Sequence, residues 1–275
     1  SCKLCQIDHT IVMKDISYKK NLDFLPYVSS NVSGQREKLY DRINYNTPEV
    51  NYGVGVNLEI NKNLSLEATL NPDFSQVEAD VTKIDINSPV AINYPERRPF
   101  FNRGIDVLDY TMDVFYSRSI NNPSFASKII NQGRKSRIYM LSAIDQNSPY
   151  IVPTQFESFS GLGGKSFNNI LRYQNIINPN IQVGALSTTR IYDGDAYGNL
   201  LGLDGLFKFS GGWKFELEYF RNSNKEPISD WIDSDKNFGE YTVRLDGESF
   251  SGNALYSELR RDTNTWRSFI RYTGI

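Results

Sequence analysis

Polar and hydrophobic residues alternate one by one along two neighbouring stretches near the start of the chain. In residues 52–60 the even positions carry Tyr, Val, Val, Leu and Ile, whereas the odd positions carry Gly, Gly, Asn and Glu. Residues 64–70 repeat the pattern, with Leu and Ala on one side and Ser, Glu and Thr on the other. A period of two places successive side chains on opposite faces of a strand. The two stretches, joined by Asn61-Lys62-Asn63, therefore predict a hairpin with one apolar and one polar face.

The same alternation, or an extended composition, returns along most of the chain. Further strands are predicted at 22–32, 110–116, 139–143, 166–177, 181–191, 201–209, 213–219, 241–245 and 266–272. Many are close to the ~9–11 residues with which a tilted strand crosses a bilayer. No stretch predicts a helix longer than one or two turns. The sequence therefore predicts an all-β protein built on an antiparallel sheet.

The predicted connections alternate in length. Short turns fall at 61–63, 178–180 and 210–212, and long connections at 72–106, 146–165 and 223–237. Transmembrane barrels have short periplasmic turns and long extracellular loops, so this alternation fits a barrel. A charged loop is also predicted at 33–49. Another long loop, predicted at 118–135, breaks the rule because it falls at the end of the short turns.

Alternation alone fits a soluble barrel with its apolar face inward and a membrane barrel with its apolar face towards lipid. The charged side chains of the polar faces would all line one side: Glu59, Glu67, Asp204, Lys208, Lys214, Glu216, Glu218, Arg244, Arg267 and Arg271. Aromatic residues recur at the ends of the apolar faces: Tyr52, Tyr110, Tyr116, Trp213, Tyr219, Tyr241, Trp266 and Tyr272. Such aromatic belts mark both interfaces of a membrane barrel. We therefore predict an antiparallel transmembrane β-barrel.

Composition narrows the function classes. The 30 basic and 32 acidic residues give a net charge of −2, whereas a nucleic-acid-binding protein would show a basic excess. His9 is the only histidine, so the chain lacks the residues of a Ser/His/Asp triad. Carboxylate pairs suffice for a glycosidase, but the sequence singles out no pair among its 32 acidic residues. We expect neither nucleic-acid binding nor enzymatic activity.

Residues 71–104 differ from the alternating segments on either side. The stretch opens with the turn Asn71-Pro72-Asp73, continues with acidic residues and ends with arginines and the prolines Pro95 and Pro99. Proline fixes its own φ angle and biases the preceding residue towards extended geometry. We expect an ordered insertion that folds back into the barrel lumen as a partial plug.

Three motifs in and after this stretch resemble a known family. They are NPDFSQVEAD (71–80), YPERRPFF (94–101) and FYSR (115–118). They resemble a bacterial outer-membrane β-barrel domain family of unknown function, often preceded by a module like the family-nine carbohydrate-binding modules. Here Arg97 stands where the family pattern has Lys, and Ser119 where it has a second Arg. The resemblance implies a barrel in the outer membrane of a Gram-negative bacterium, longer than this chain, and implies no reaction.

Charged residues of the insertion and of the FYSR motif form the candidate site. A charged segment inside a lumen needs oppositely charged partners, because a lone buried charge is costly. We therefore predict an ion-pair network that holds the insertion in place. We call its members the latch residues: Asp73, Glu78, Asp80, Glu96, Arg97, Arg98, Arg103 and Arg118.

Calcium is the alternative explanation for the acidic part of this set. Asp73, Glu78 and Asp80, with Asp85 nearby, offer the carboxylate oxygens that Ca²⁺ takes as ligands. Their spacing does not fit an EF-hand loop. No other cofactor is predicted.

The two ends of the chain carry further expectations. Cys2 and Cys5 are spaced C-x-x-C and predict a structural disulfide, with a metal half-site or unpaired thiols as alternatives. We expect a polar N-terminal segment at 1–21 and an incomplete barrel domain at 22–275, with 71–104 inserted in its lumen. It is incomplete because no closing segment follows the strand predicted at 266–272, so the chain is expected to be a fragment or to be completed by another chain.

Two loops carry weaker chemistry. The glycine-rich residues 161–165 lack the spacing of a phosphate-binding loop and predict a flexible loop tip. Trp231 and Phe238 either stack on sugars or pack their loop against the barrel rim, and we favour packing.

Two functions from different classes fit a membrane barrel. One is a porin-like channel or transport component linked to glycan uptake, which the insertion constricts. The other is a non-conducting structural barrel that anchors a carbohydrate-binding module or belongs to a surface complex. A soluble glycan-binding barrel is a third, less favoured hypothesis. The expected partners are outer-membrane lipid, a glycan or small solute, and a partner protein of a surface complex.

Overall fold

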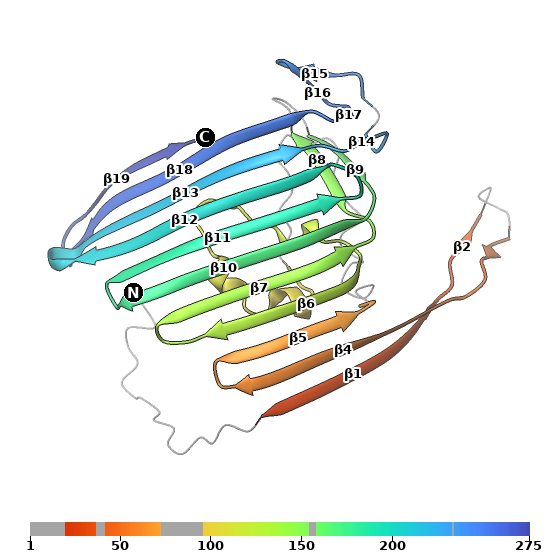
Figure 1. Cartoon of the computed structure of the whole chain (residues 1–275), viewed down its shortest axis with the longest axis horizontal. Coiled ribbons are helices and arrows are strands. Elements are labelled where there is room, and N and C mark those ends of the chain that lie inside the picture. The colour runs from red at the N-terminus through yellow and green to blue at the C-terminus, as the bar shows by residue number, and fades with distance from the viewer. Residues whose placement is uncertain (1–19, 37–41, 73–95, 154–157, 233) are drawn as a thin grey trace.

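A curved antiparallel sheet dominates the computed structural model, which describes residues 20–36, 42–72, 96–153, 158–232 and 234–275. Its eleven strands follow one another in space in the order in which they occur along the chain (Figure 1). They are β1 (Asn21–Asn31), β4 (Glu49–Asn61), β5 (Leu64–Leu70), β6 (Pro123–Gln132), β7 (Ser136–Asp145), β10 (Ser166–Asn178), β11 (Ile181–Tyr192), β12 (Tyr197–Phe209), β13 (Trp213–Lys225), β18 (Ser249–Asp262) and β19 (Arg267–Gly274).

Smaller elements lie in the connections. Four two-stranded pairs are present: β2 (Gly34–Gln35) with β3 (Asn44–Tyr45), β8 (Pro149–Pro153) with β9 (Ser158–Leu162), β14 (Ile228–Ser229) with β17 (Leu245–Asp246), and β15 (Asn237–Phe238) with β16 (Tyr241–Thr242). The helices are single turns: α2 (Pro99–Asn102), η2 (Ile105–Leu108), η3 (Ser117–Ser119) and η4 (Ser210–Gly212). Among the described residues, no helix has the length and apolar character needed to span a membrane.

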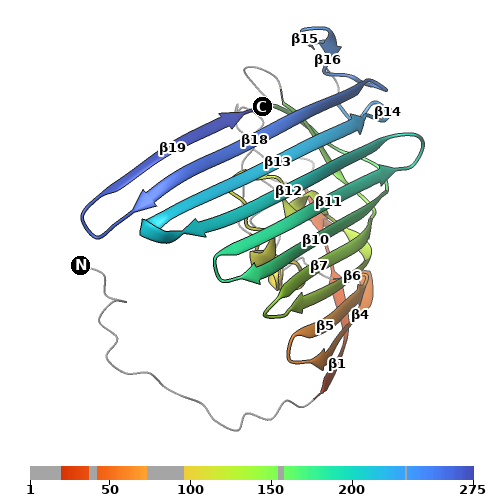
Figure 2. The same ribbon diagram turned by 60° about the vertical axis from the view of Figure 1, so that its left-hand side comes forward.

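The sheet curls without closing. β1 and β19 are its two edges, and they do not pair with each other in the described part of the chain (Figure 2). The predicted all-β antiparallel fold is confirmed, whereas a closed barrel is not what these eleven strands form. The twist of neighbouring strands accounts for the curvature, since long matched pairings accumulate it. β12 and β13, for example, pair without a break from Tyr197↔Lys225 to Phe209↔Trp213.

The two faces of the sheet differ in what covers them. Along β10, Asn168 and Arg172 are buried on the inner, concave face, whereas Leu171 and Tyr173 are exposed on the outer face. The outer face of β12, two strands further along the sheet, shows the same character, since Leu201 is 61% exposed. A soluble sheet with one open face normally buries its apolar side, so this arrangement is inverted. The inner face is covered by the segment between β5 and β6 (Figure 2).

This covering segment, residues 96–122, is called the insert below. It carries α2, η2 and η3 and runs on to residue 122, well beyond the predicted end at 104. The strand predicted at 110–116 is therefore wrong. Its alternating side chains arise because Tyr110, Met112 and Val114 pack on the inner-face core, not because the segment joins the sheet. Tyr110 and Tyr116 consequently do not belong to an outer aromatic belt.

Two strands were missed by the alternation. The loop predicted at 118–135 contains β6, and β18 was not predicted at all. In both strands the inner and outer residues differ little in polarity, because the insert packs against the inner face and requires apolar residues there. Ile130 of β6 and Ala254 of β18 are apolar inner-face residues that contribute to the core or pack against it, opposite apolar or small outer neighbours.

The core lies between insert and sheet. Buried hydrophobic residues from both sides form one cluster: Phe101, Val107, Leu108, Ile120, Ala126, Ile130, Tyr139, Leu141, Ala143, Ile170, Leu186 and Phe220. The strand predicted at 241–245 is also not part of the main sheet. Its Val243 and Leu245 are instead buried in the loops beyond the end of β13. Arg244 of that segment, predicted to face the lumen, lies in the same loop and is exposed.

Candidate functional site

Arg98 ties the beginning of the insert to its end. Its buried guanidinium donates to both carboxylate oxygens of Glu96, with Nη2–Oε2 at 2.8 Å and Nε–Oε1 at 3.0 Å. It also donates to the carbonyl oxygens of Ile120, at 2.7 Å, and Ser117, at 3.1 Å. The Ser117 hydroxyl donates to the same carboxylate. Pro99 begins α2 directly afterwards, where its missing N–H costs no hydrogen bond, so the turn starts at this ion pair.

The surroundings of Glu96 favour its charged form. Burial raises the pKa of the Glu96 carboxyl, but hydrogen bonds from Arg98, the charge of Arg98 and the Ser117 hydroxyl together outweigh it. The net pKa lies below the ordinary value. The ion pair is therefore fully formed at neutral pH.

Lys128 of β6 anchors the insert from the wall. Its buried ammonium lies 3.0 Å from Oε2 of Glu67 and donates to the carbonyl oxygen of Arg103 at 3.0 Å and to that of Phe100. Arg103 in turn pairs with the other oxygen of Glu67 at 3.0 Å. Gly104 follows with a φ of 79°, and a side chain here would collide with Ile130. Only glycine lets the insert turn this close to the wall.

Arg172 of β10 makes a second wall contact. Its Nη2 donates to Oδ2 of Asp204 at 2.9 Å, and its Nε donates to the carbonyl oxygen of Val107 in η2 at 3.2 Å. The guanidinium also lies 4.8 Å from the ring centre of Tyr110. The ion pair between β10 and β12 thus contacts both η2 and Tyr110.

Two wall carboxylates and one arginine hold the remaining backbone of the insert. Glu218 of β13 accepts the N–H groups of Thr111, at 2.8 Å, and Met112. Asp145, at the end of β7, accepts the N–H groups of Asn121 and Asn122 at the end of the insert. The Arg190 Nη2 donates to the carbonyl oxygen of Ser119 at 2.8 Å. Because buried backbone groups need partners, these side chains replace the strand partners that the insert lacks.

The latch residues differ in their partners and in their exposure. Glu96 and Arg98 pair with each other inside the insert, and Arg103 joins it to Glu67 and Glu59 of the sheet. Arg97 lies exposed at the surface. Asp73, Glu78, Asp80 and Asp85 lie outside the described residues, as do Cys2 and Cys5. The predicted calcium site and disulfide therefore stay predictions.

The strongest wall contacts were not predicted as site residues. Lys128, Arg172, Asp145 and Arg190 are inner-face residues at strand positions, and only their charge inside otherwise apolar or small stretches distinguishes them. Glu218 was predicted to line the polar face, but not to bind backbone. A charge at an inner position of a period-two segment marks Glu218, whereas Lys128 lies in a strand that showed no such alternation, and the sheet register brings the others to the insert.

Two cavities lie at opposite ends of the strands, with the insert between them. The larger, of about 550 Å³, is lined by residues near the start of β10 and the ends of β11 and β13, by the β8–β9 pair and by residues 114–120 of the insert. The smaller, of about 260 Å³, adjoins the short turn at 61–63 and is bordered by Arg103 and Gln132. The insert therefore separates the space at the long-loop end from that at the short-turn end.

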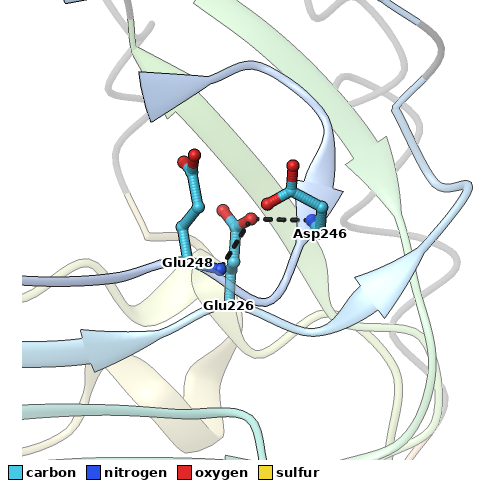
Figure 3. A group of neighbouring side chains, drawn as sticks. All are labelled: Glu226, Asp246 and Glu248. Carbon is cyan, nitrogen blue, oxygen red and sulfur yellow. Dashed lines mark hydrogen bonds between the residues drawn. The ribbon is translucent and has the colours of Figure 1, made fainter. Parts of the chain in front are cut away.

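An acidic group lies in the loops beyond β13 (Figure 3). The carboxylates of Glu226, Asp246 and Glu248 approach within 4.8 Å of one another. Glu226 is buried, and its Oε1 accepts the N–H groups of Asp246 at 2.8 Å, Gly247 at 3.2 Å and Glu248 at 3.3 Å. Burial raises the pKa of Glu226 above its ordinary value although these N–H groups act against the shift. These bonds give the group a structural role in closing the turn.

A separate hydrophobic cluster joins the long loops. Val152, Ile232, Val243 and Leu245 are buried together, with Trp231 packed against them. We call these five residues the loop core. Trp231 also lies directly on the glycines at 161 and 163, where any side chain would collide with it. The prediction that Trp231 packs its loop is confirmed, and the glycine-rich stretch is packed, not a free loop tip.

Known proteins resemble this chain in part. Residues 20–141, less than half of the chain, match the family described as Domain of unknown function (DUF5916). The matched residues contain the three motifs of the sequence analysis. No curated protein matches the chain.

Among solved structures, the in-vitro folded outer membrane protein OmpT of Vibrio cholerae is 8% identical, covering 95% of this chain and 88% of its own, with a TM-score of 0.35. Its trimer form is 9% identical, covering 92% and 88%, with a TM-score of 0.32. TM-scores this low carry no conclusion about fold or function.

Proposed function

We propose that the protein is a β-barrel component of the bacterial outer membrane whose interior is plugged by the insert, and that it serves transport of a small solute. The inverted polarity of the sheet carries the proposal. Its outer face exposes large apolar side chains along several strands, among them Leu203 and Ile270, exposed by 62% and 76%. Its inner face buries Lys128, Arg172 and Glu218 against the insert.

The polarity has a physical reason in a bilayer. Apolar side chains on the outer face would promote aggregation in water, whereas in a bilayer they contact lipid. Exposed tyrosines and tryptophans such as Trp213, Tyr219 and Tyr272 fit the interfacial positions of such a barrel. A spanning sheet must have no open edge, because unpaired backbone groups in lipid cost several kcal/mol each. The proposal therefore requires further strands between β19 and β1 that close the barrel.

The insert decides what kind of transport component this is. Its position between the two cavities argues against passage of a solute by simple diffusion through an open pore. Alongside the hydrophobic core, its contacts with the wall include buried ion pairs and hydrogen bonds, such as those of Lys128, and these polar contacts can be hydrated when the insert moves. This favours a gated route over a permanently open porin.

Partition and conductance test the proposal in two steps. The protein should fractionate with the outer membrane and migrate differently on a gel before and after heating. In planar bilayers the unchanged protein should conduct rarely, whereas Lys128→Met should raise the open time because it removes the ammonium that holds Arg103 and Phe100. Lys135→Met, at an exposed residue just before β7 that lines neither cavity, is the matched control and should leave conductance unchanged.

A non-conducting barrel is the second candidate. The extent of the buried core between insert and sheet favours it, because that core stabilises the plug against leaving. Membrane insertion without conductance in either variant would support this anchoring role, including the display of a carbohydrate-binding module, and would rule out transport. A soluble product with no need for detergent would contradict both membrane proposals.

A further inference from the structure

The larger cavity has an unusual charge composition. Among the lining residues that the structure describes, Arg190 and Lys225 are basic and none is acidic. The chain as a whole carries a net charge of −2, so a basic cavity is not a reflection of composition. The cavity volume of about 550 Å³ falls within the range typical of small-molecule sites.

The strand register builds the floor of this cavity. One cross-strand row runs Asn168, Arg190, Gly198, Asn224 and Phe250. Gly198 stands at the centre of the row, and a side chain placed there would approach only the Asn224 carboxamide, at 3.1 Å. The row therefore forms a shallow trough bordered by a guanidinium and two carboxamides.

Arg190 keeps an uncompensated positive charge at this trough. Its Nε donates to Oδ1 of Asn168 at 2.7 Å, its Nη2 to the Ser119 carbonyl at 2.8 Å and its Nη1 to the Tyr192 hydroxyl at 3.3 Å. All these acceptors are neutral, and no carboxylate pairs with Arg190 in the part of the chain that is described. The bonds fix the guanidinium in place without neutralising it, as a preorganised anion site requires.

A second lining residue offers an unused acceptor. The Oδ1 atom of Asn222, in the next row along the trough, is buried and accepts no hydrogen bond from the described residues. Leaving a buried acceptor unsatisfied is costly, and a ligand hydroxyl or N–H group would satisfy it. The side of the cavity next to Arg190 is aromatic, since Tyr150 and Tyr192 border it with ring centres 5.9 Å apart.

We propose that this cavity binds a small hydroxylated organic anion. The carboxylate or phosphate group of the ligand lies against Arg190, with Lys225 at the rim, and a hydroxyl group donates to Asn222. The apolar side of the ligand packs on the two tyrosines. The role of the cavity as the selectivity site of the transport route rests on the proposed function, whereas ligand binding itself does not.

Titration calorimetry on the full protein in detergent micelles tests the inference. The probes are glucuronate and glycerol phosphate, each compared with its neutral counterpart, glucose or glycerol. Each anion should bind at least about tenfold more tightly than its counterpart, as expected for one charge-assisted contact. High salt should reduce the difference for both anions.

Two variants locate the binding. Asn222→Asp adds a carboxylate of nearly the same shape and should weaken anion binding by about tenfold or more through repulsion and competition for Arg190. Gly198→Val fills the trough without changing charge and should weaken it as well. Asn180→Asp makes the same chemical change in an exposed short turn at the other end of β10 and is the matched control. Retained heat-modifiable migration shows that each variant is folded.

The outcomes separate the inference from the proposed function. Equal binding of charged and neutral probes, no binding of either anion, or binding that both cavity variants leave unchanged overturns the inference. Anion binding lost in Asn222→Asp supports it even if bilayers show no conductance, in which case only the transport role fails. Conductance without anion binding would support the transport role and overturn the inference about the cavity.

Discussion

The insert and the loop core are two packed regions of one molecule that are stabilised by different means. The insert is fixed by buried charges, because Arg98, Lys128 and Arg172 each bind a carboxylate and at least one backbone carbonyl. The loop core is held by apolar side chains around Trp231, and Glu226, the buried carboxylate of the adjoining turn, accepts backbone N–H groups. Hydrophobic contacts suffice where two loops meet, whereas a segment without strand partners needs polar side chains to satisfy its backbone.

Arg98→Met should have the largest effect, and it should weaken the docking of the insert without changing the loop core. The change leaves the Glu96 carboxylate buried without its partner and frees two carbonyl oxygens, so docking of the insert should weaken by about 3–5 kcal/mol. Limited proteolysis at Arg103 measures it. Arg97→Met, at the exposed neighbour, is the control and should change the cleavage rate much less. Equal cleavage in the two variants would show that the Arg98 bonds do not hold the insert.

Trp231→Ala should give an intermediate effect confined to the loop core. A fully buried aromatic residue costs about 3–5 kcal/mol when truncated, and the partial burial of Trp231 reduces this to about 2 kcal/mol. Hydrogen exchange at Val243 should rise while the protection of the insert stays constant. Trp266→Ala, at a residue 64% exposed, serves as control. A simultaneous loss of protection in the insert would mean that the two regions unfold together.

Acidification should have the smallest effect, and it should change the stability of the two regions differently. The pKa of Glu96 is lowered in the folded protein, so its contribution is present above 4.5 and is lost as pH falls towards the lowered value. The pKa of Glu226 is raised, so its ionisation opposes folding and its contribution is greatest at low pH, declining as pH rises through the raised value. Lowering the pH should therefore reduce protection of the Arg98 amide and preserve that of Asp246.

Substitution of either carboxylate sharpens this pH test. Glu96→Gln should remove the acid sensitivity of the Arg98 amide, and Glu226→Gln should flatten the pH dependence at Asp246. An unchanged pH profile in Glu96→Gln would assign the acid sensitivity of the insert to another carboxylate.

The alternating pattern predicted those strands whose outward-facing residues are apolar and whose inward-facing residues are polar. β4 and β5 satisfy this condition, as do the parts of β12 and β13 next to their connecting turn, and the predicted segments fall within the observed bounds. The parts of β12 and β13 that were not predicted contain the apolar inner residues Leu200 and Phe220. β18 does not satisfy the condition, because its inner residues include Phe250 and Ala254. The insert imposes this exception by placing a hydrophobic core inside the sheet, and no local pattern in the strand reveals what will cover it.

The candidate site was predictable in kind more than in detail. The stretch around Glu96, Arg98 and Arg103 was singled out because its charges required partners, and all three form ion pairs. The prediction that they would serve one network was too simple, since Glu96 and Arg98 satisfy each other. Partners such as Arg172 lie far away in sequence, and only the sheet register brings them to the insert.

That register also dictates an order of assembly. Each strand of the main sheet pairs with its sequence neighbour in the sheet, so the sheet can grow from short-range contacts. The insert bonds instead to Asp204 and Glu218, which lie 94 and 107 residues beyond Tyr110 and Thr111. Contacts between such distant residues form slowly because a long loop must close first. The segment that fills the interior therefore completes its docking only after β13 has joined, whereas its contacts with Lys128 and Asp145 can form as soon as β6 and β7 are in place.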